Sequence, residues 1–227
     1  MANKGNKRHL KALSAPMYFA IKKKGSKYVI KQDPGRFTLE TSVPLSVAIR
    51  KIFGDNLSNS EIKKILNGNN VKVNNKVIRN ARYPIGLNDI VYFEALNKIY
   101  MIGIDKQAKL VINELDKMPE GRIQKIIGKY KTKGNKIMIR LYDGVTVSYN
   151  KEAKVNDSVV IGKDNKILKM IRLEVGAKCF VYDGVHVGET GTIKELISGA
   201  SNRDASAKIE SGNVVFDTLL QNIMVIE

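Results

Sequence analysis

The 227-residue sequence predicts a mixed α+β fold made of a small α/β module, a β-rich central domain and a small, strongly bent β-barrel. Three observations support this prediction. Apolar residues recur with helical spacing between residues 45 and 66, whereas from residue 90 onward they form short, alternating runs of strand length. Turn signals separate those runs at regular intervals, which favours small barrels or twisted sheets over alternating strand–helix units.

The first 13 residues are polar and basic and carry too little apolar surface to fold by themselves. They form either a solvated tail or an arm that becomes ordered on a polyanion, and their charge favours the arm. Ser14 and Pro16 are then typical of a helix start. They predict a short helix over residues 17–21, which ends at residues 22–25.

Residues 42–94 form the clearest unit. Pro44 opens a helix whose apolar residues share one face, and Gly54 follows it. Ser58 and Glu61 then form a capping box, in which each side chain satisfies a backbone amide of the other residue. The capping box predicts a second helix, with its apolar residues again on one side.

The end of this unit predicts a turn and a hairpin. Gly68 is placed to end the second helix in a left-handed conformation. Residues 71–77 predict two short strands around Asn74 and Asn75, because asparagine tolerates positive φ better than most residues.

The remaining chain predicts strands. Short apolar or alternating runs occur at residues 90–93, 99–104, 110–112, 123–130, 137–141, 145–149, 158–161 and 167–173. Lys133-Gly-Asn135, Asp143-Gly144 and Lys163-Asp-Asn-Lys166 are turn signals between them.

The stretch YDGVHVGETGT, residues 182–192, raises the question of a phosphate-binding loop. Such a loop needs backbone amides that converge at a helix start, and here a strand-like run follows instead. Asp183-Gly184 suits a type I′ turn between strands at 179–181 and 185–187. Gly188 and Gly191 permit turns where a Cβ would clash, so the stretch predicts a bent barrel and no nucleotide site.

Charge is the strongest functional signal. The chain carries 39 Lys and Arg against 22 Asp and Glu, a net charge of +17. Residues 1–36, 37–110, 111–172 and 173–227 carry net charges of +9, +5, +7 and −4. Such an excess opposes compaction, and an extended polyanion, RNA or DNA, is the simplest partner that offsets it.

Cations recur on the N-terminal segment, both predicted helices and the hairpin. A run of charge usually marks only a solvated face, but few acidic residues are interspersed here, which favours a binding surface. The candidate RNA-binding residues are Lys4, Lys7, Arg8, Lys11, Lys22, Lys23, Lys24, Arg50, Lys51, Lys63, Lys64, Lys72, Lys76, Arg79 and Arg82.

Enzymatic function finds little support in the residue types. The single cysteine, Cys179, excludes an internal disulfide and a multi-cysteine zinc site, and its strand-like surroundings predict a buried thiol. His9 lies in the basic arm and His186 among strand residues, so no nucleophile–base pair can be assembled. We therefore expect no catalysis, no cofactor and no metal. The longest apolar run is about six residues, far short of a membrane span, so we expect a cytoplasmic protein.

Several segments match a known family. Residues 45–91 (IRK, SNSEIKKIL, VKVNNKVIRN and YPIGLNDIV) resemble the S4-type RNA-binding module. HLKALSAP, VPL, KVNDSVVI and LLQNIMVIE, in that order, resemble the archaeal and eukaryotic small-subunit ribosomal protein family S4e. Residues 176–193 resemble the KOW motif of that family, including Gly188 and Gly191.

The resemblance implies a non-catalytic constituent of the small ribosomal subunit, with ribosomal RNA and neighbouring ribosomal proteins as partners. It implies a basic N-terminal extension (1–41), an S4-type module (42–94), a β-rich central domain (95–173) and an SH3-like KOW barrel (174–227). Two alternatives use the same modules only for docking: an RNA-modifying enzyme, and a translation or transcription factor.

Overall fold

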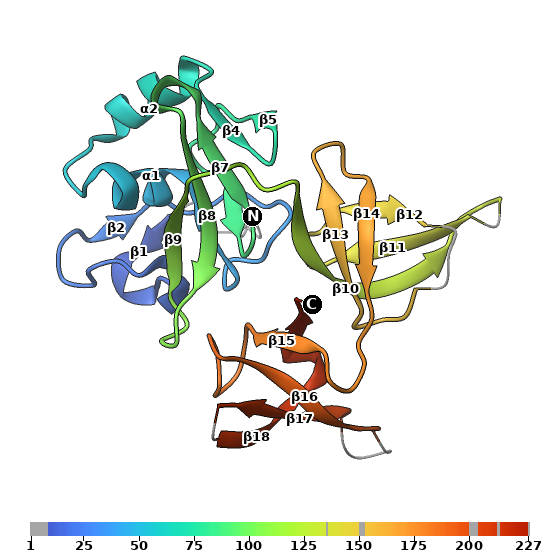
Figure 1. The fold of residues 1–227 in the computed structure, drawn as a ribbon. Helices are drawn as coiled ribbons and strands as arrows, with labels where there is room; N and C mark the ends of the chain where they lie inside the picture. Colours follow the sequence, from blue (N-terminus) through green and yellow to red (C-terminus); the bar gives the residue numbers. More distant parts are fainter. Residues whose placement is uncertain (1–8, 135, 150–152, 200–203, 213, 227) are drawn as a thin grey trace, which may run out of the picture. The chain divides into compact units, whose positions relative to one another are not determined.

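The computed structural model describes residues 9–134, 136–149, 153–199, 204–212 and 214–226. The chain forms two compact units. Unit 1 comprises residues 1–103 and 109–117, and unit 2 comprises residues 104–108 and 118–227 (Figure 1).

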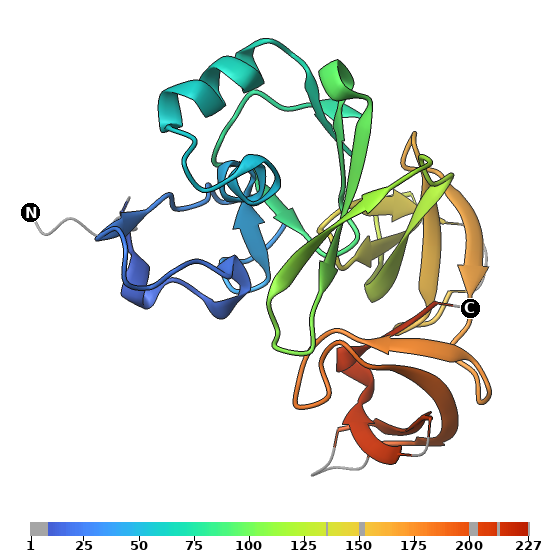
Figure 2. The same cartoon turned by 60° about the vertical axis from the view of Figure 1, so that its left-hand side comes forward.

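Unit 1 contains both α-helices, as the sequence predicts. α1 (Leu45–Phe53) begins after Pro44 and ends at Gly54. α2 (Asn59–Asn67) begins with the predicted capping box, in which the Ser58 amide donates to Glu61 Oε2 at 2.7 Å and the Glu61 amide donates to Ser58 Oγ at 3.2 Å. Both helices lie on one side of the unit's largest sheet (Figures 1 and 2).

The largest sheet of unit 1 has the strand order β5-β4-β7-β8-β9. Its strands are β4 (Val71–Val73), β5 (Lys76–Val77), β7 (Ile90–Phe93), β8 (Lys98–Ile104) and β9 (Leu110–Leu115). The Phe53 and Phe93 rings meet edge to face at 5.1 Å, which packs α1 against β7. Asn74 and Asn75 between β4 and β5 have φ of 48° and 68°, which confirms the predicted turn.

Two small ladders and three short helical turns complete unit 1. β1 (Leu10–Lys11) pairs with β2 (Tyr28–Val29), and β3 (Ser42–Pro44) pairs with β6 (Pro84–Gly86). The 3₁₀ turns are η1 (Ala12–Ser14), η2 (Met17–Phe19) and η3 (Glu94–Leu96).

Two local predictions in unit 1 are wrong. The expected helix over residues 17–21 is only the turn η2, because Phe19 is fully buried and Ala20 follows it with a left-handed φ of 46°. Ser14 does not cap it, since its hydroxyl donates to the Lys11 carbonyl. Gly68 keeps a right-handed conformation with φ −67°, and Asn69 takes the left-handed one with φ 61°.

Unit 2 contains two five-stranded sheets. The first has the order β12-β11-β10-β13-β14. Its strands are β10 (Gly121–Lys131), β11 (Ile137–Leu141), β12 (Thr146–Ser148), β13 (Ser158–Gly162) and β14 (Ile167–Ile171). Because β10 is long, its first half pairs with β13 and its second half with β11, with a register shift between Ile126 and Gly128. Ile126, Ile139 and Val159 lie in its core.

The second sheet of unit 2 has the order β18-β17-β16-β15-β19. Its elements are β15 (Lys178–Val181), β16 (Thr190–Ile197), β17 (Ser206–Ser211), β18 (Val214–Leu219), the turn η4 (Leu220–Asn222) and β19 (Ile223–Val225). Its core contains Cys179, Ile209 and Phe216.

The glycine-rich stretch 182–192 lies in this second sheet and its turns. A Cβ on Gly188 would lie 2.7 Å from the Lys106 amide nitrogen, and the φ of Gly188 is 82°. A Cβ on Gly191 would lie 2.5 Å from the Glu210 carbonyl oxygen, so close backbone approach requires glycine at both positions. The predicted strand over 185–187 is wrong, because these residues form a turn. Asp183 has no positive φ, so the predicted type I′ turn is also wrong.

A buried lysine lies where the two sheets of unit 2 meet. Lys125 on β10 is 2% exposed, and its Nζ donates to the Leu220 carbonyl at 2.5 Å. Its Nζ also lies 5.5 Å from the centroid of the Tyr182 ring. The Val225 amide donates to Ser158 Oγ at 3.0 Å at the same junction. Burial alone lowers the pKa of Lys125 to about 7, because the interior disfavours the charged form.

Candidate nucleic-acid interface

The predicted binding residues differ in their exposure and in their partners within the folded chain. Lys4, Lys7 and Arg8 lie outside the described residues. Lys11 is exposed on β1, and Lys24 is exposed in the segment that follows η2. Lys23 is held by the backbone, since its Nζ donates to the Ala15 carbonyl.

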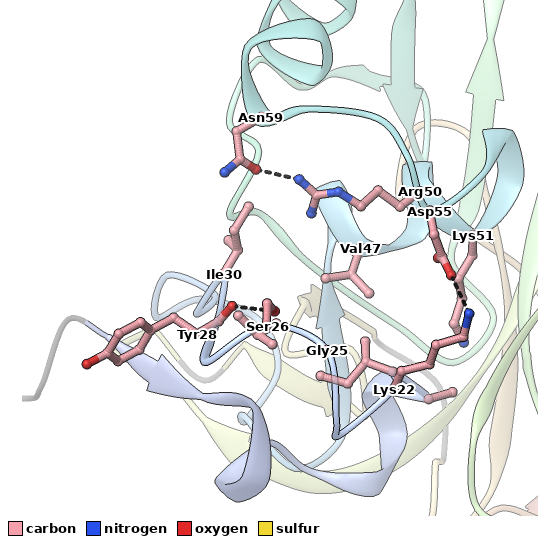
Figure 3. Close-up of a pocket in the computed structure, with 13 residues that line it drawn as sticks. Lys22, Gly25, Ser26, Tyr28, Ile30, Val47, Arg50, Lys51, Asp55 and Asn59 are labelled. Carbon is pink, nitrogen blue, oxygen red and sulfur yellow. Dashed lines mark hydrogen bonds and ion pairs between the residues drawn. The ribbon is translucent and has the colours of Figure 1, made fainter.

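Three of the predicted cations line one pocket of about 540 Å³ in unit 1 (Figure 3). Its walls come from residues 20–30, from α1 and from the start of α2. Lys22, Arg50 and Lys51 contribute the positive charge, and Asp55 is the one carboxylate among the lining residues. Cations separated by nearly 30 residues in the sequence therefore meet at one concave surface.

Each of these cations has a different environment. Lys22 Nζ lies 3.7 Å from Asp55 Oδ2, and both side chains are exposed. Arg50 donates from Nε to the Leu57 carbonyl at 3.0 Å and from Nη2 to Asn59 Oδ1 at 2.5 Å. Lys51 donates to the Leu110 carbonyl at 2.9 Å, and burial lowers its pKa.

The α2 cations and the β4–β5 hairpin cations are less uniform than the sequence predicts. Lys63, Lys64 and Lys76 are exposed, and within the described residues none of them has a carboxylate within 4 Å. Lys72, in contrast, forms an ion pair with Glu94.

Two arginines near the hairpin are also engaged. Arg79 Nε donates to Asn69 Oδ1 at 2.7 Å. Arg82 Nη1 lies 3.7 Å from Asp33 Oδ1. Both contacts are exposed and therefore weak, so each arginine can exchange its partner for a phosphate.

The structure adds a basic hairpin that is not among the binding residues predicted from the sequence. β10 and β11 carry Lys131 and Arg140, and their connection carries Lys133 and Lys136, all exposed and without an ion pair to any described carboxylate. Tyr130 on the same hairpin is 46% exposed. The signal was present in the sequence, since residues 127–140 contain five basic and no acidic residues.

The cysteine and the two histidines, which were considered as catalytic residues, make packing contacts in the fold. Cys179 is buried, as predicted, and burial raises its pKa to about 11. The His186 ring stacks on Phe216 at 4.0 Å, and the His9 ring meets Tyr28 edge to face. Among the described residues, no group of three His, Cys, Asp or Glu side chains could hold a metal ion. The same part of the chain has no helix long and apolar enough to cross a membrane.

The fold and these surfaces define a class: a mostly β protein with a small two-helix module and several exposed cationic surfaces, which suits a polyanionic partner. Comparisons with known proteins narrow the class. Residues 4–36 match the RS4NT (NUC023) domain model, and residues 96–167 match the model of ribosomal family S4e.

Relatives cover nearly the whole chain. It is 34% identical to small ribosomal subunit protein eS4 of Methanocella arvoryzae, over 96% of this chain and 93% of the relative. It is 30% identical to eS4 of Methanosphaera stadtmanae, over 100% of this chain and 95% of the relative. The crystal structure of 30S ribosomal protein S4e from Thermoplasma acidophilum superimposes with a TM-score of 0.70 at 26% identity, covering 82% of this chain and 95% of that one. The chain belongs to the S4e family of ribosomal proteins.

Proposed function

We propose that this protein is a structural, non-catalytic constituent of the small ribosomal subunit, located on the cytoplasmic ribosome, and that it binds ribosomal RNA. The observation that carries the proposal is the set of exposed cations that form no ion pair with a described carboxylate, on a chain whose relatives bear the name small ribosomal subunit protein eS4. Those names give no support to the alternatives of an RNA-modifying enzyme or a translation or transcription factor.

The proposed contacts follow the predicted modules. Residues 1–41 act as a basic extension, 42–94 as an S4-type module, 95–173 as a β-rich central domain and 174–227 as an SH3-like KOW barrel. The cations predicted from the sequence contact RNA from the first two modules, and the β10–β11 hairpin contacts it from the third. The last module, with a net charge of −4, is the part best suited to meet neighbouring ribosomal proteins.

Binding of small-subunit ribosomal RNA over a series of salt concentrations tests the proposal. Neutralised phosphates release counterions, so the logarithm of the affinity should fall linearly with the logarithm of salt concentration, by about 0.7 to 0.9 for each phosphate. A flat response would contradict phosphate binding by these cations.

A matched pair of charge reversals tests the predicted surface. Lys76→Glu removes an exposed, unpaired hairpin cation and should weaken RNA binding by about tenfold and lower the salt slope by about one to two phosphates. Lys194→Glu makes the same charge change next to Glu210, in the acidic last quarter of the chain, and should have a much smaller effect. Equal losses would show only a general effect of net charge.

A further inference from the structure

The pocket of unit 1 has the features of a site for one unstacked nucleotide. Resting on the proposed RNA binding, we propose that this pocket holds a single nucleotide of the bound RNA, with its base against the apolar wall and its phosphate next to Lys22. This assigns the pocket a ligand class and a specific role within the RNA complex.

The size and the wall of the pocket suit a base. About 540 Å³ lies within the range of sites for small organic ligands. Ile21, Val29 and Ile30 from the N-terminal segment and Val47 from α1 form its apolar lining (Figure 3). Proteins that recognise unpaired RNA splay single bases out of the strand and bind their faces on such surfaces.

Arg50 supplies a fixed planar group beside that wall. Its guanidinium donates to Asn59 Oδ1 (Figure 3) and also to the Leu57 carbonyl, so its plane is set before a ligand arrives. A guanidinium held in this way can stack on a base and loses little conformational entropy when it does so.

The cations of the pocket complement a phosphate. Lys22 has a side chain that is 85% exposed, and its pair with Asp55 is correspondingly weak, so a phosphate can replace the carboxylate at little cost. Lys51 is half-buried and donates to a neutral carbonyl, and the favourable charge of nearby Asp55 does not offset the effect of burial on its pKa. An anion that enters the pocket would offset the unfavourable burial that lowers the pKa of Lys51.

The combination favours a nucleotide over an acidic peptide. Three cations face one carboxylate, which requires an anionic ligand, and the apolar wall requires a flat or apolar group attached to it. A nucleotide carries an anionic phosphate and a flat base in one unit. An acidic peptide carries the negative charge but has little flat or apolar surface to cover the wall.

The first experiment uses methyl NMR on the full chain with three probes: adenosine monophosphate, inorganic phosphate and a glutamate hexapeptide. Adenosine monophosphate should shift the methyl resonances of Ile30 and Val47, and the other two probes should leave them in place. Lys22→Ala should weaken adenosine monophosphate binding several-fold without changing the response to adenosine. Shifts of Ile30 and Val47 that are equal with phosphate or with the hexapeptide would overturn the nucleotide assignment.

The second experiment blocks the pocket. Gly25 has an unstrained φ, and a Cβ there makes only an ordinary contact with the Lys22 carbonyl at 3.9 Å, so Gly25→Trp should fold. It should lower the affinity for small-subunit ribosomal RNA about tenfold, the effect of losing one stacked base. Val185→Trp adds the same side chain at a position 94% exposed in unit 2 and should bind as the wild type does.

The outcomes separate the two proposals. If the wild type fails to bind ribosomal RNA at low salt, both the proposed function and the nucleotide site are wrong. If it binds with a salt dependence, but adenosine monophosphate shifts neither methyl and Gly25→Trp binds like Val185→Trp, only the nucleotide site is wrong.

Discussion

Replacing Lys125 by methionine is expected to stabilise unit 2 near neutral pH and to remove a pH dependence from its stability. Lys125 is 2% exposed and is held by one neutral acceptor, the Leu220 carbonyl, and by the face of Tyr182. No described carboxylate forms an ion pair with it. Methionine has a similar length, so it fills the same space without a charge.

The free-energy cost of burying the Lys125 charge follows from its lowered pKa. Lysine has an ordinary pKa of 10.5, and burial lowers that of Lys125 to about 7 in the folded protein. Between these values the unfolded chain binds more protons than the folded one, so the stability of the wild type rises with pH. At pH 6 the folded state bears the full cost of the buried charge, roughly 5 kcal/mol, and between pH 6 and pH 9.5 about 3 kcal/mol of it is relieved.

The Lys125→Met variant has no buried charge, so it does not bear this cost. It leaves the Leu220 carbonyl without a hydrogen-bond donor, however, which destabilises the variant by about 1–3 kcal/mol. Lys125→Met should therefore be more stable than the wild type by about 2–4 kcal/mol at pH 6. The difference should shrink by about 3 kcal/mol at pH 9.5 and vanish or reverse. Urea unfolding followed by the methyl resonances of Ile126 and Ile139, which lie in the core of the same sheet, measures it at both values.

Lys131→Met is the control, since it removes an exposed lysine from the same strand without a buried charge to relieve. The difference in unfolding free energy between Lys131→Met and the wild type should stay nearly constant between the two pH values. If the difference for Lys125→Met is equally constant, Lys125 is not a buried charge, and the reasoning from burial fails.

Three further substitutions test how the fold is held. Ser58→Ala removes the capping box and should cost about 1 kcal/mol in thermal unfolding of unit 1; no change would mean that α2 does not depend on its cap. Arg122→Ala leaves the fully buried Asp143 without its ion-pair partner and should cost about 3–5 kcal/mol in urea unfolding, and a loss below 1 kcal/mol would argue against a buried pair. Gly191→Ala places a Cβ against the Glu210 backbone and should cost about 3 kcal/mol by the same assay, whereas Gly128→Ala, with open space around it, should cost less than about 1 kcal/mol; equal costs would refute the steric argument.

The sequence predicted those elements whose signals are local. The capping box of Ser58 and Glu61 and the Asn74-Asn75 turn depend on residues that contact each other within a few positions, and both are confirmed. The mixed α+β class and the two helices between residues 45 and 67 are likewise confirmed, because the apolar period changes where the structure changes from helices to strands.

Predictions failed where distant contacts decide the conformation. The helix expected over 17–21 is reduced to a turn because Phe19 is buried beside β3, a contact that helix signals do not encode. Val185–Val187 has the composition of a strand, but Gly188 must approach the backbone of Lys106, and the chain turns there. Such approaches join residues about 80 positions apart.

The same limit applies to the binding surface. The composition of the sequence predicts that the binding surface is positively charged. Ion pairing within the folded chain determines which of its cations are available to bind a phosphate. Lys72 meets Glu94 and Arg82 meets Asp33, and in each case the partner comes from a different element. The β10–β11 hairpin, by contrast, brings Lys131 and Arg140 together by strand pairing, on a segment that was predicted only to be β-rich.

This difference bears on how the protein would hold RNA. A lysine already paired with a carboxylate, such as Lys194 with Glu210 or Lys208 with Glu195, has little bound counterion to release, and a phosphate must first displace its partner. Counterion release therefore comes mainly from exposed cations that form no ion pair with a described carboxylate, such as Lys63 on α2, Lys76 in the β4–β5 hairpin and Lys133 in the β10–β11 hairpin. The salt dependence of RNA binding should accordingly reflect that smaller set, and its slope should fall well short of the value that a net charge of +17 would give.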